Sequence, residues 1–191
     1  MLFPKLFDKP PLGYCPGRTL RRVMAELPKS VVADAAGACR AVLTTADGSL
    51  KCDVRETLER HFLMHIVAVE FTVSVPAVAV PEARIRVGNT GVVSRTGVVC
   101  DAPAPYREAV RFLTDRIEGD SKLRSDLLRL DFSYCEIMGS DEGWTIRLAP
   151  YGGSEVVSTV PPFRRYIRLG RTQSEGLVMT LRRLRHVVAA A

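Results

Sequence analysis

The chain has 191 residues, 47% of them hydrophobic and 25% charged, which is typical of a folded globular protein and excludes an intrinsically disordered one. Its 27 basic residues outnumber its 21 acidic residues, and most of the surplus positive charge falls within residues 151–191. A charge concentrated at one place can attract an anionic partner more effectively than a diffuse charge.

The start of the chain predicts an irregular tail over residues 1–16. Prolines and charged residues interrupt its apolar residues, so the tail does not resemble a secretory signal peptide. The most apolar stretch, 63–80, contains His65, Glu70 and Pro76, which a membrane-spanning helix rarely tolerates. We therefore expect a cytoplasmic protein without a membrane partner.

The clearest local pattern lies over residues 39–55, where Asp47-Gly48 predicts a two-residue turn between two strands. This register pairs Leu43 with Cys52 and gives the hairpin one apolar and one polar face. The polar face carries Arg40, Thr44, Lys51, Asp53 and Arg55.

Periodicity and turn residues predict the other elements. Helices are expected over residues 19–27, 55–65, 105–118, from 120 or 121 onward, and over 172–188, where Thr172 to Glu175 fits a capping box. Strands are expected over 66–75, 83–87, 92–100, 132–138, 144–148, 155–160 and 164–169.

This order predicts an α+β fold, an antiparallel sheet built of hairpins with helices packed on one face. We expect one domain over residues 17–191, with an alternative division into two similar halves, each a helix followed by strands, over 17–102 and 103–191. The cysteines are Cys15, Cys39, Cys52, Cys100 and Cys135; they form no CxxC pair, so we expect reduced thiols.

No catalytic signature is present, because the patterns GxGxxG, GxxxxGK[ST], GxSxG and HExxH are all missing from the sequence. His61 and His65 stand four apart, and Glu70 could add a carboxylate to form a metal site. Apolar residues fill the gap between the two histidines, so we interpret His65 as a buried side chain with a hydrogen-bond partner. We predict no catalytic residue, no metal site and no cofactor.

The arginine-rich end of the chain offers a candidate binding surface. In a strand over 164–169, Arg164, Tyr166 and Arg168 project from one face, and Arg171 follows. Arginines that flank an aromatic ring suit a base and its phosphate, and a guanidinium fork also suits a carboxylate. The arginines of the final helix are expected to fan around it rather than to form a stripe.

Four segments together resemble an uncharacterised bacterial family, domain of unknown function 3156, over about residues 12 to 187. They are Tyr14-Cys15-Pro16-Gly17-Arg18-Thr19-Leu20, Phe62-Leu63-Met64-His65 with Glu70-Phe71, Ser154-Glu155-Val156-Val157, and Arg164-Arg165-Tyr166-Ile167-Arg168-Leu169. The family has no established activity, so the resemblance implies a bacterial, cytoplasmic protein and assigns no functional residue.

The sequence therefore leaves two functions open. The first is a non-enzymatic binding domain that uses Arg164, Tyr166, Arg168 and Arg171 for an anionic partner, either nucleic acid or an acidic protein. The alternative is a small-molecule-binding protein or enzyme with a pocket between sheet and helices that includes His65 and Glu70. A homodimer formed through sheet edges or the apolar tail is a further interpretation.

Overall fold

The computed structural model describes residues 13–78, 80–91 and 96–190, which form helices and antiparallel strands. In chain order they are α1 (Arg18–Glu26), β1 (Val31–Gly37), β2 (Arg40–Thr45), β3 (Lys51–Arg60), β4 (Met64–Val75), β5 (Ala83–Thr90), β6 (Gly97–Asp101), α2 (Arg107–Gly119), α3 (Ser121–Arg129), β7 (Phe132–Ser140), β8 (Gly143–Pro150), β9 (Ser154–Ser158), β10 (Phe163–Ile167) and α4 (Arg171–Ala189).

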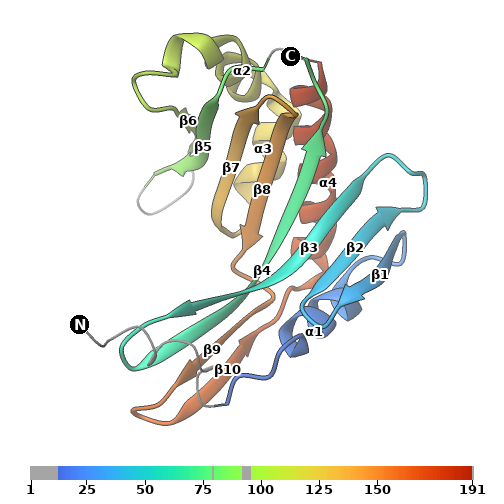
Figure 1. Ribbon diagram of the computed structural model, residues 1–191, viewed down its shortest axis with the longest axis vertical. Helices are drawn as coiled ribbons and strands as arrows, with labels where there is room; N and C mark the ends of the chain where they lie inside the picture. The colour runs from blue at the N-terminus through green and yellow to red at the C-terminus, as the bar shows by residue number, and fades with distance from the viewer. Residues whose placement is uncertain (1–12, 79, 92–95, 191) are drawn as a thin grey trace.

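One sheet contains all the described strands, in the order β1-β2-β3-β4-β8-β7-β5-β6. The long strand β4 holds it together. One edge of β4 pairs with β3, while its other edge pairs with β8 near its end and with β9 near its start. Strand β10 pairs with β9, so β9 and β10 form a branch beside the β3–β4 hairpin (Figure 1).

The helices cover one face of this sheet, and the other face is left open. Alternate strand residues such as Val54, Phe71 and Ile146 are buried in the core with the inner stripe of α4. In Figure 1, α3 and α4 lie behind β7, β8 and β4. The residues between the buried ones form the open face, where charged side chains predominate on the central strands. This confirms the predicted α+β fold with an antiparallel sheet.

The predicted hairpin over residues 39–55 is confirmed in its register, because Leu43 pairs with Cys52. The predicted helix over 55–65 is wrong. Strand β3 continues to Arg60 and pairs along its length with β4. The backbone partners offered by β4 outweigh a helical preference that rests on only a few residues.

A buried carboxylate fixes the start of α1. Glu56 on β3 accepts hydrogen bonds from the Tyr14 hydroxyl (2.8 Å), the Gly17 amide (2.9 Å) and the Leu20 amide (3.0 Å). It therefore caps the helix from a neighbouring strand, which satisfies amides that have no partner within the helix. Gly17 has a φ of 72°, and a Cβ there would lie 1.8 Å from the carbonyl oxygen of Ala38.

Two other predictions need correction or fall partly outside the described residues. The capping box over 172–175 is wrong, since α4 begins at Arg171 after Gly170 and no side chain caps it. Of the strand predicted over 92–100, residues 92–95 lie outside the described part, and β6 begins at Gly97. Strands β8 and β7 of the second predicted half lie between β4 and β5 of the first half in one sheet, and both halves share one core. Among the described helices, none has the length and apolarity needed to cross a membrane.

Candidate functional site

A row of charged side chains crosses the open face of the sheet. Cross-strand pairing places Arg40 opposite Arg55, Arg55 opposite Glu70, Arg147 opposite Glu136, and Arg86 opposite both Glu136 and Asp101. We call this set the charged row: Arg40 (β2), Arg55 (β3), Glu70 (β4), Arg147 (β8), Glu136 (β7), Arg86 (β5) and Asp101 (β6). Opposite charges alternate along it except at its Arg40 end.

Glu70 is the centre of the charged row and is fully buried, although it lies on the open face. The side chains of its partners cover it. Its carboxylate accepts hydrogen bonds from Arg55 Nε (2.7 Å) and Arg147 Nε (2.9 Å), and from the hydroxyl of Tyr134. Such charge-assisted bonds are stronger than neutral ones.

The two arginines determine the protonation state of Glu70. Burial acts to raise its pKa, but the hydrogen bonds from Arg147 and Tyr134 and the charges of Arg147 and Arg55 outweigh burial and lower the pKa. Glu70 is therefore ionised at neutral pH. In return, the hydrogen bond to Glu70 raises the pKa of Arg147, which keeps its guanidinium charged and fixed in place.

The Arg40 end of the row has an unbalanced charge. Arg40 lies directly opposite Arg55, and like charges in this position repel one another. Within the described part of the chain, Arg40 has no ion-pair partner. A hollow of about 330 Å³ opens here, lined by Arg40, Asp53, Val54, Arg55, Glu70, Thr72 and Arg147. We call it the anion hollow, because three guanidinium groups meet there and one of its two carboxylates is already occupied.

On the other side of Glu70 the charges are balanced. Arg84 donates two hydrogen bonds to Glu136, at 2.6 and 2.9 Å, and Arg86 lies 3.5 Å from the same carboxylate. A second hollow of about 350 Å³ adjoins this part of the row. Since its arginines already have a carboxylate, it attracts an anion less than the anion hollow does.

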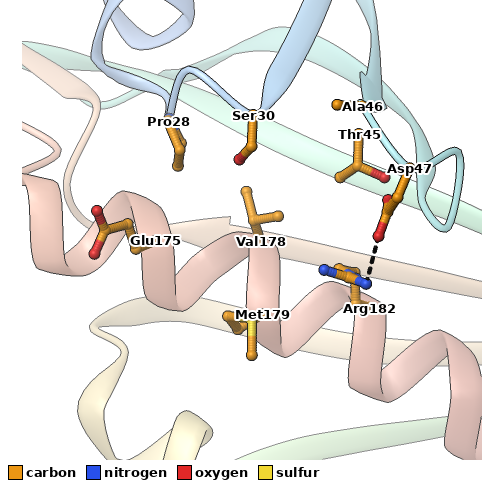
Figure 2. Close-up of a pocket in the computed structure, with 9 residues that line it drawn as sticks. All are labelled: Pro28, Ser30, Thr45, Ala46, Asp47, Glu175, Val178, Met179 and Arg182. Carbon is orange, nitrogen blue, oxygen red and sulfur yellow. Dashed lines mark hydrogen bonds and ion pairs between the residues drawn. The ribbon is translucent and has the colours of Figure 1, made fainter.

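A larger groove runs along α4 beside the β2–β3 turn, and Figure 2 shows its lining. Its volume is about 510 Å³, and Pro28, Ser30, Thr45, Ala46, Asp47, Glu175, Val178, Met179 and Arg182 line it. Arg182 and Asp47 point toward each other across one end and form an ion pair at 2.7 Å (Figure 2). Apolar side chains make up much of the remaining wall.

The arginines of α4 meet at a neighbouring hollow of about 470 Å³, lined by Ser49, Met179, Arg182, Arg183, Arg185 and His186. Arg182 and Arg185, three residues apart, both reach the β2–β3 turn, whereas Arg183 reaches carboxylates of α3 and its cap, so these arginines fan around the helix as predicted. Their charges are largely neutralised. Arg183 pairs with Asp120 and Asp126, and Arg185 donates to the carbonyl of Ser49.

The arginines expected to bind an anion at the start of this region also have carboxylate partners. Arg164 lies 3.2 Å from Glu155, Arg168 lies 3.4 Å from Glu26, and Arg171 lies 2.9 Å from Glu175. The hydroxyl of Tyr166 donates to Glu26, and the guanidinium of Arg22 covers its ring at 4.9 Å. Anion binding at these residues stays a prediction, and the geometry gives it no support.

His65 and Glu70 do not share a pocket, which corrects the alternative drawn from the sequence. They are five residues apart in β4, and an odd separation places side chains on opposite faces of a strand. His65 is buried on the helix-covered face, and its Nε2 has no hydrogen-bond partner among the described residues. Burial, followed by the charge of Arg164, lowers its pKa.

The five cysteines are all free thiols. Burial raises the pKa of both Cys52 and Cys100 to about 12, and it also raises that of Cys135. Within the ranges that the structure describes, no three His, Cys, Asp or Glu side chains are grouped to hold a metal ion.

Comparison with known proteins identifies the family but no activity. The family described as "Protein of unknown function (DUF3156)" matches residues 26–188. The chain belongs to this family. No curated protein and no solved structure is detectably similar to it. The site of this DUF3156 protein therefore has to be interpreted from its own geometry.

The sequence contained part of the signal for the anion hollow. The predicted Asp47-Gly48 turn already placed Arg40 and Arg55 on one polar face, and its register sets them opposite each other. Arg147 could not be assigned in this way, because β8 joins β4 across a long separation in sequence.

Proposed function

We propose that this DUF3156 protein is a bacterial, cytoplasmic binding protein that holds an anionic group of its partner in the anion hollow. The proposal rests on the direct opposition of Arg40 and Arg55, and on the excess of three guanidinium groups over two carboxylates, Asp53 and Glu70, in the lining of the hollow. Repulsion between the two guanidinium groups costs stability in the free protein. A bound phosphate or carboxylate removes that cost and accepts hydrogen bonds from both.

The neighbouring residues support this role by fixing the site in advance. Arg55 donates its Nε to Glu70 and keeps its terminal N–H groups for a ligand. Glu70 likewise orients Arg147, so a ligand does not have to order these side chains when it binds. In this arrangement Glu70 is a positioning residue, and Arg40, Arg55 and Arg147 contact the anion.

The shape of the site suits a single anionic group of a larger partner better than a small molecule that the protein would enclose. The hollow has about the volume of the smallest ligand pockets, and it lies on an open sheet face. A nucleic-acid phosphate and the carboxylate of an acidic protein both fit this description, as expected for a non-enzymatic interaction domain. The binding surface differs from the one that the arginine-rich end predicted.

Titration calorimetry with two probes tests the proposal: single-stranded oligothymidylate for nucleic acid and polyglutamate for an acidic protein. We expect one of them to bind, with an affinity that falls as the salt concentration rises. Arg40→Gln lowers that affinity about tenfold, because it removes a charge-assisted contact. The control is Arg111→Gln, an exposed arginine on α2. Equal affinities of the two variants, or no binding at low salt, contradict the proposal.

A second candidate function is small-molecule binding in the groove along α4. Its volume of about 510 Å³ and its apolar wall, with an ion pair at one end, support this alternative. The amphiphilic dye anilinonaphthalene sulfonate serves as a probe. Met179→Trp fills the groove and reduces dye fluorescence, whereas Phe112→Trp on α2 leaves it unchanged. Equal fluorescence of the two variants counts against the groove as a ligand site.

A further inference from the structure

Two loops lie side by side at the far end of the β3–β4 and β9–β10 hairpins. The amide of Thr159 donates to the carbonyl of Leu63, which joins the loops directly. Behind them, Ser158 pairs with Met64 on one side and with Phe163 on the other. In Figure 1 both hairpins extend away from α2, α3 and α4 toward the same end of the molecule.

Both loops present apolar side chains to solvent. Phe62 is 98% exposed and Val160 is 62% exposed, and the neighbouring Leu63, Met64 and Phe163 are exposed as well. We call residues 62–64 and 160–163 the apolar tips. Exposed apolar surface of this kind, gathered at one place, marks a site of interaction with a protein or a membrane.

Two basic side chains, arginine or histidine, lie next to each apolar tip in the sequence. Arg60 and His61 precede the first tip, and Arg165 follows the second together with Arg164, which is already paired with Glu155. Arg165 lies on the open face, where it pairs with Val156 in the register of the branch. It has no ion-pair partner within the described ranges, so its charge is free to meet an anion.

The charges argue against a second copy of this chain as the partner. Strand β10 lies at an edge of the branch, and a copy could pair with it antiparallel. Pairing centred on the strand would set Arg165 opposite the same residue of the copy, and like charges opposite each other are destabilising. A partner with negative charge avoids this cost.

We propose that the apolar tips and their basic borders dock on an anionic lipid surface. Protruding apolar side chains can enter the boundary between head groups and acyl chains, and arginines beside them can meet lipid phosphates. Projecting loops suit a fluid layer better than a flat protein surface. The proposal does not depend on the anion hollow, and it replaces the expectation of no membrane partner, which considered only membrane-spanning segments.

Co-sedimentation with vesicles tests this docking. We expect the protein to bind phosphatidylcholine vesicles that contain about 30% phosphatidylserine, and to bind pure phosphatidylcholine much less. The double variant Phe62→Ser, Val160→Ser lowers the partition coefficient between vesicle and water at least about tenfold. The wild-type protein gains free energy by moving these two apolar side chains from water into the lipid layer, and serine does not supply that gain. The matched control is Val78→Ser, since Val78 is 95% exposed but lies in the β4–β5 connection.

The basic border is tested by charge reversal. Arg165→Glu weakens binding to the anionic vesicles, while Lys122→Glu on α3 does not. Phe62→Trp places a fluorescent reporter at the tip, and its emission shifts to shorter wavelength when the anionic vesicles are added. Arg40→Gln leaves vesicle binding unchanged, so failure of the anion hollow and failure of the tips give different results.

Several outcomes overturn the proposal. The proposal is wrong if the protein does not bind the anionic vesicles at low salt. It is also wrong if Val78→Ser lowers vesicle binding as much as the double variant Phe62→Ser, Val160→Ser does. A loss caused by Phe3→Ser with Phe7→Ser but not by the tip variant assigns binding to the tail of the chain. Tip-dependent binding of polyglutamate without vesicle binding assigns the tips to a protein partner.

Discussion

Removal of the charge at Glu70 tests how the charged row is held together. In Glu70→Gln the volume of the side chain is kept, but the two arginines lose their shared carboxylate. The glutamine oxygen can still accept from Tyr134 or from one arginine. The bonds from Arg55 and Arg147, at 2.7 and 2.9 Å, therefore cannot both keep their strength.

The size of the effect follows from burial. Breaking a buried ion pair by removing one partner costs about 3–5 kcal/mol when the remaining charge stays buried. Here the side chains of Arg55 and Arg147 are 51% and 28% exposed, so water hydrates them once Glu70 is neutral. We therefore expect the free energy of unfolding to fall by about 2 kcal/mol, below the fully buried range.

Urea denaturation measures this change. The single tryptophan, Trp144, is buried and reports unfolding by fluorescence, with circular dichroism as a second probe. The control is Asp141→Asn in the exposed β7–β8 turn, which should change stability by less than about 0.5 kcal/mol. A similarly small change in Glu70→Gln would show that the charge of Glu70 does not stabilise the row. Additive effects of Glu70→Gln and Arg147→Gln would show that the two residues are not coupled, since coupled residues are not additive.

Four further predictions concern the helix-covered face. Gly17→Ala lowers the free energy of unfolding by at least about 2 kcal/mol, because its Cβ would clash with the carbonyl of Ala38; an unchanged urea midpoint contradicts this. Glu56→Ala removes the cap of α1 and costs about 1–3 kcal/mol in the same assay, and wild-type stability would show that the cap is dispensable. The lowered pKa of His65 means that, below about pH 6.5, the unfolded chain binds more protons than the folded protein. Stability therefore falls as the pH drops from 7 toward 5, and His65→Gln makes this slope shallower; an unchanged slope rules out His65 as its source. The thiol of Cys52, with its pKa raised to about 12, reacts with Ellman's reagent at pH 8 only after unfolding, so the folded wild-type protein and Cys52→Ser should show the same number of fast-reacting thiols; one fewer in Cys52→Ser would contradict its burial.

Local signals in the sequence were sufficient for some elements. The Asp47-Gly48 turn signal predicts the correct register of the β2–β3 hairpin, but the loop is longer than two residues, since β2 ends at Thr45, β3 begins at Lys51 and the Ala46 amide donates to Ser30. The buried stripe of α4, including Leu177, Leu181 and Leu184, follows from its helical spacing. In each case neighbours along the chain carry the necessary information.

Other features depend on pairing between distant segments. Residues 55–60 become a strand because β4 pairs with them, and β4 in turn joins two separate partners, β8 and β9. The charged row is assembled by these long-range pairs, so Arg147 reaches Glu70 only in the folded sheet. The arginines of the predicted surface have carboxylate partners for a related reason. Glu26, far from Arg168 in sequence, lies beside it in the fold.

A crystal of the protein soaked in selenate, whose anomalous signal locates the anion, tests the anion hollow most directly. We expect selenate oxygens within about 3 Å of the guanidinium nitrogens of Arg40 and Arg55 in the wild-type protein, and an empty hollow in Arg40→Gln. An anomalous peak only elsewhere, for example beside Arg185 on α4, would contradict this expectation.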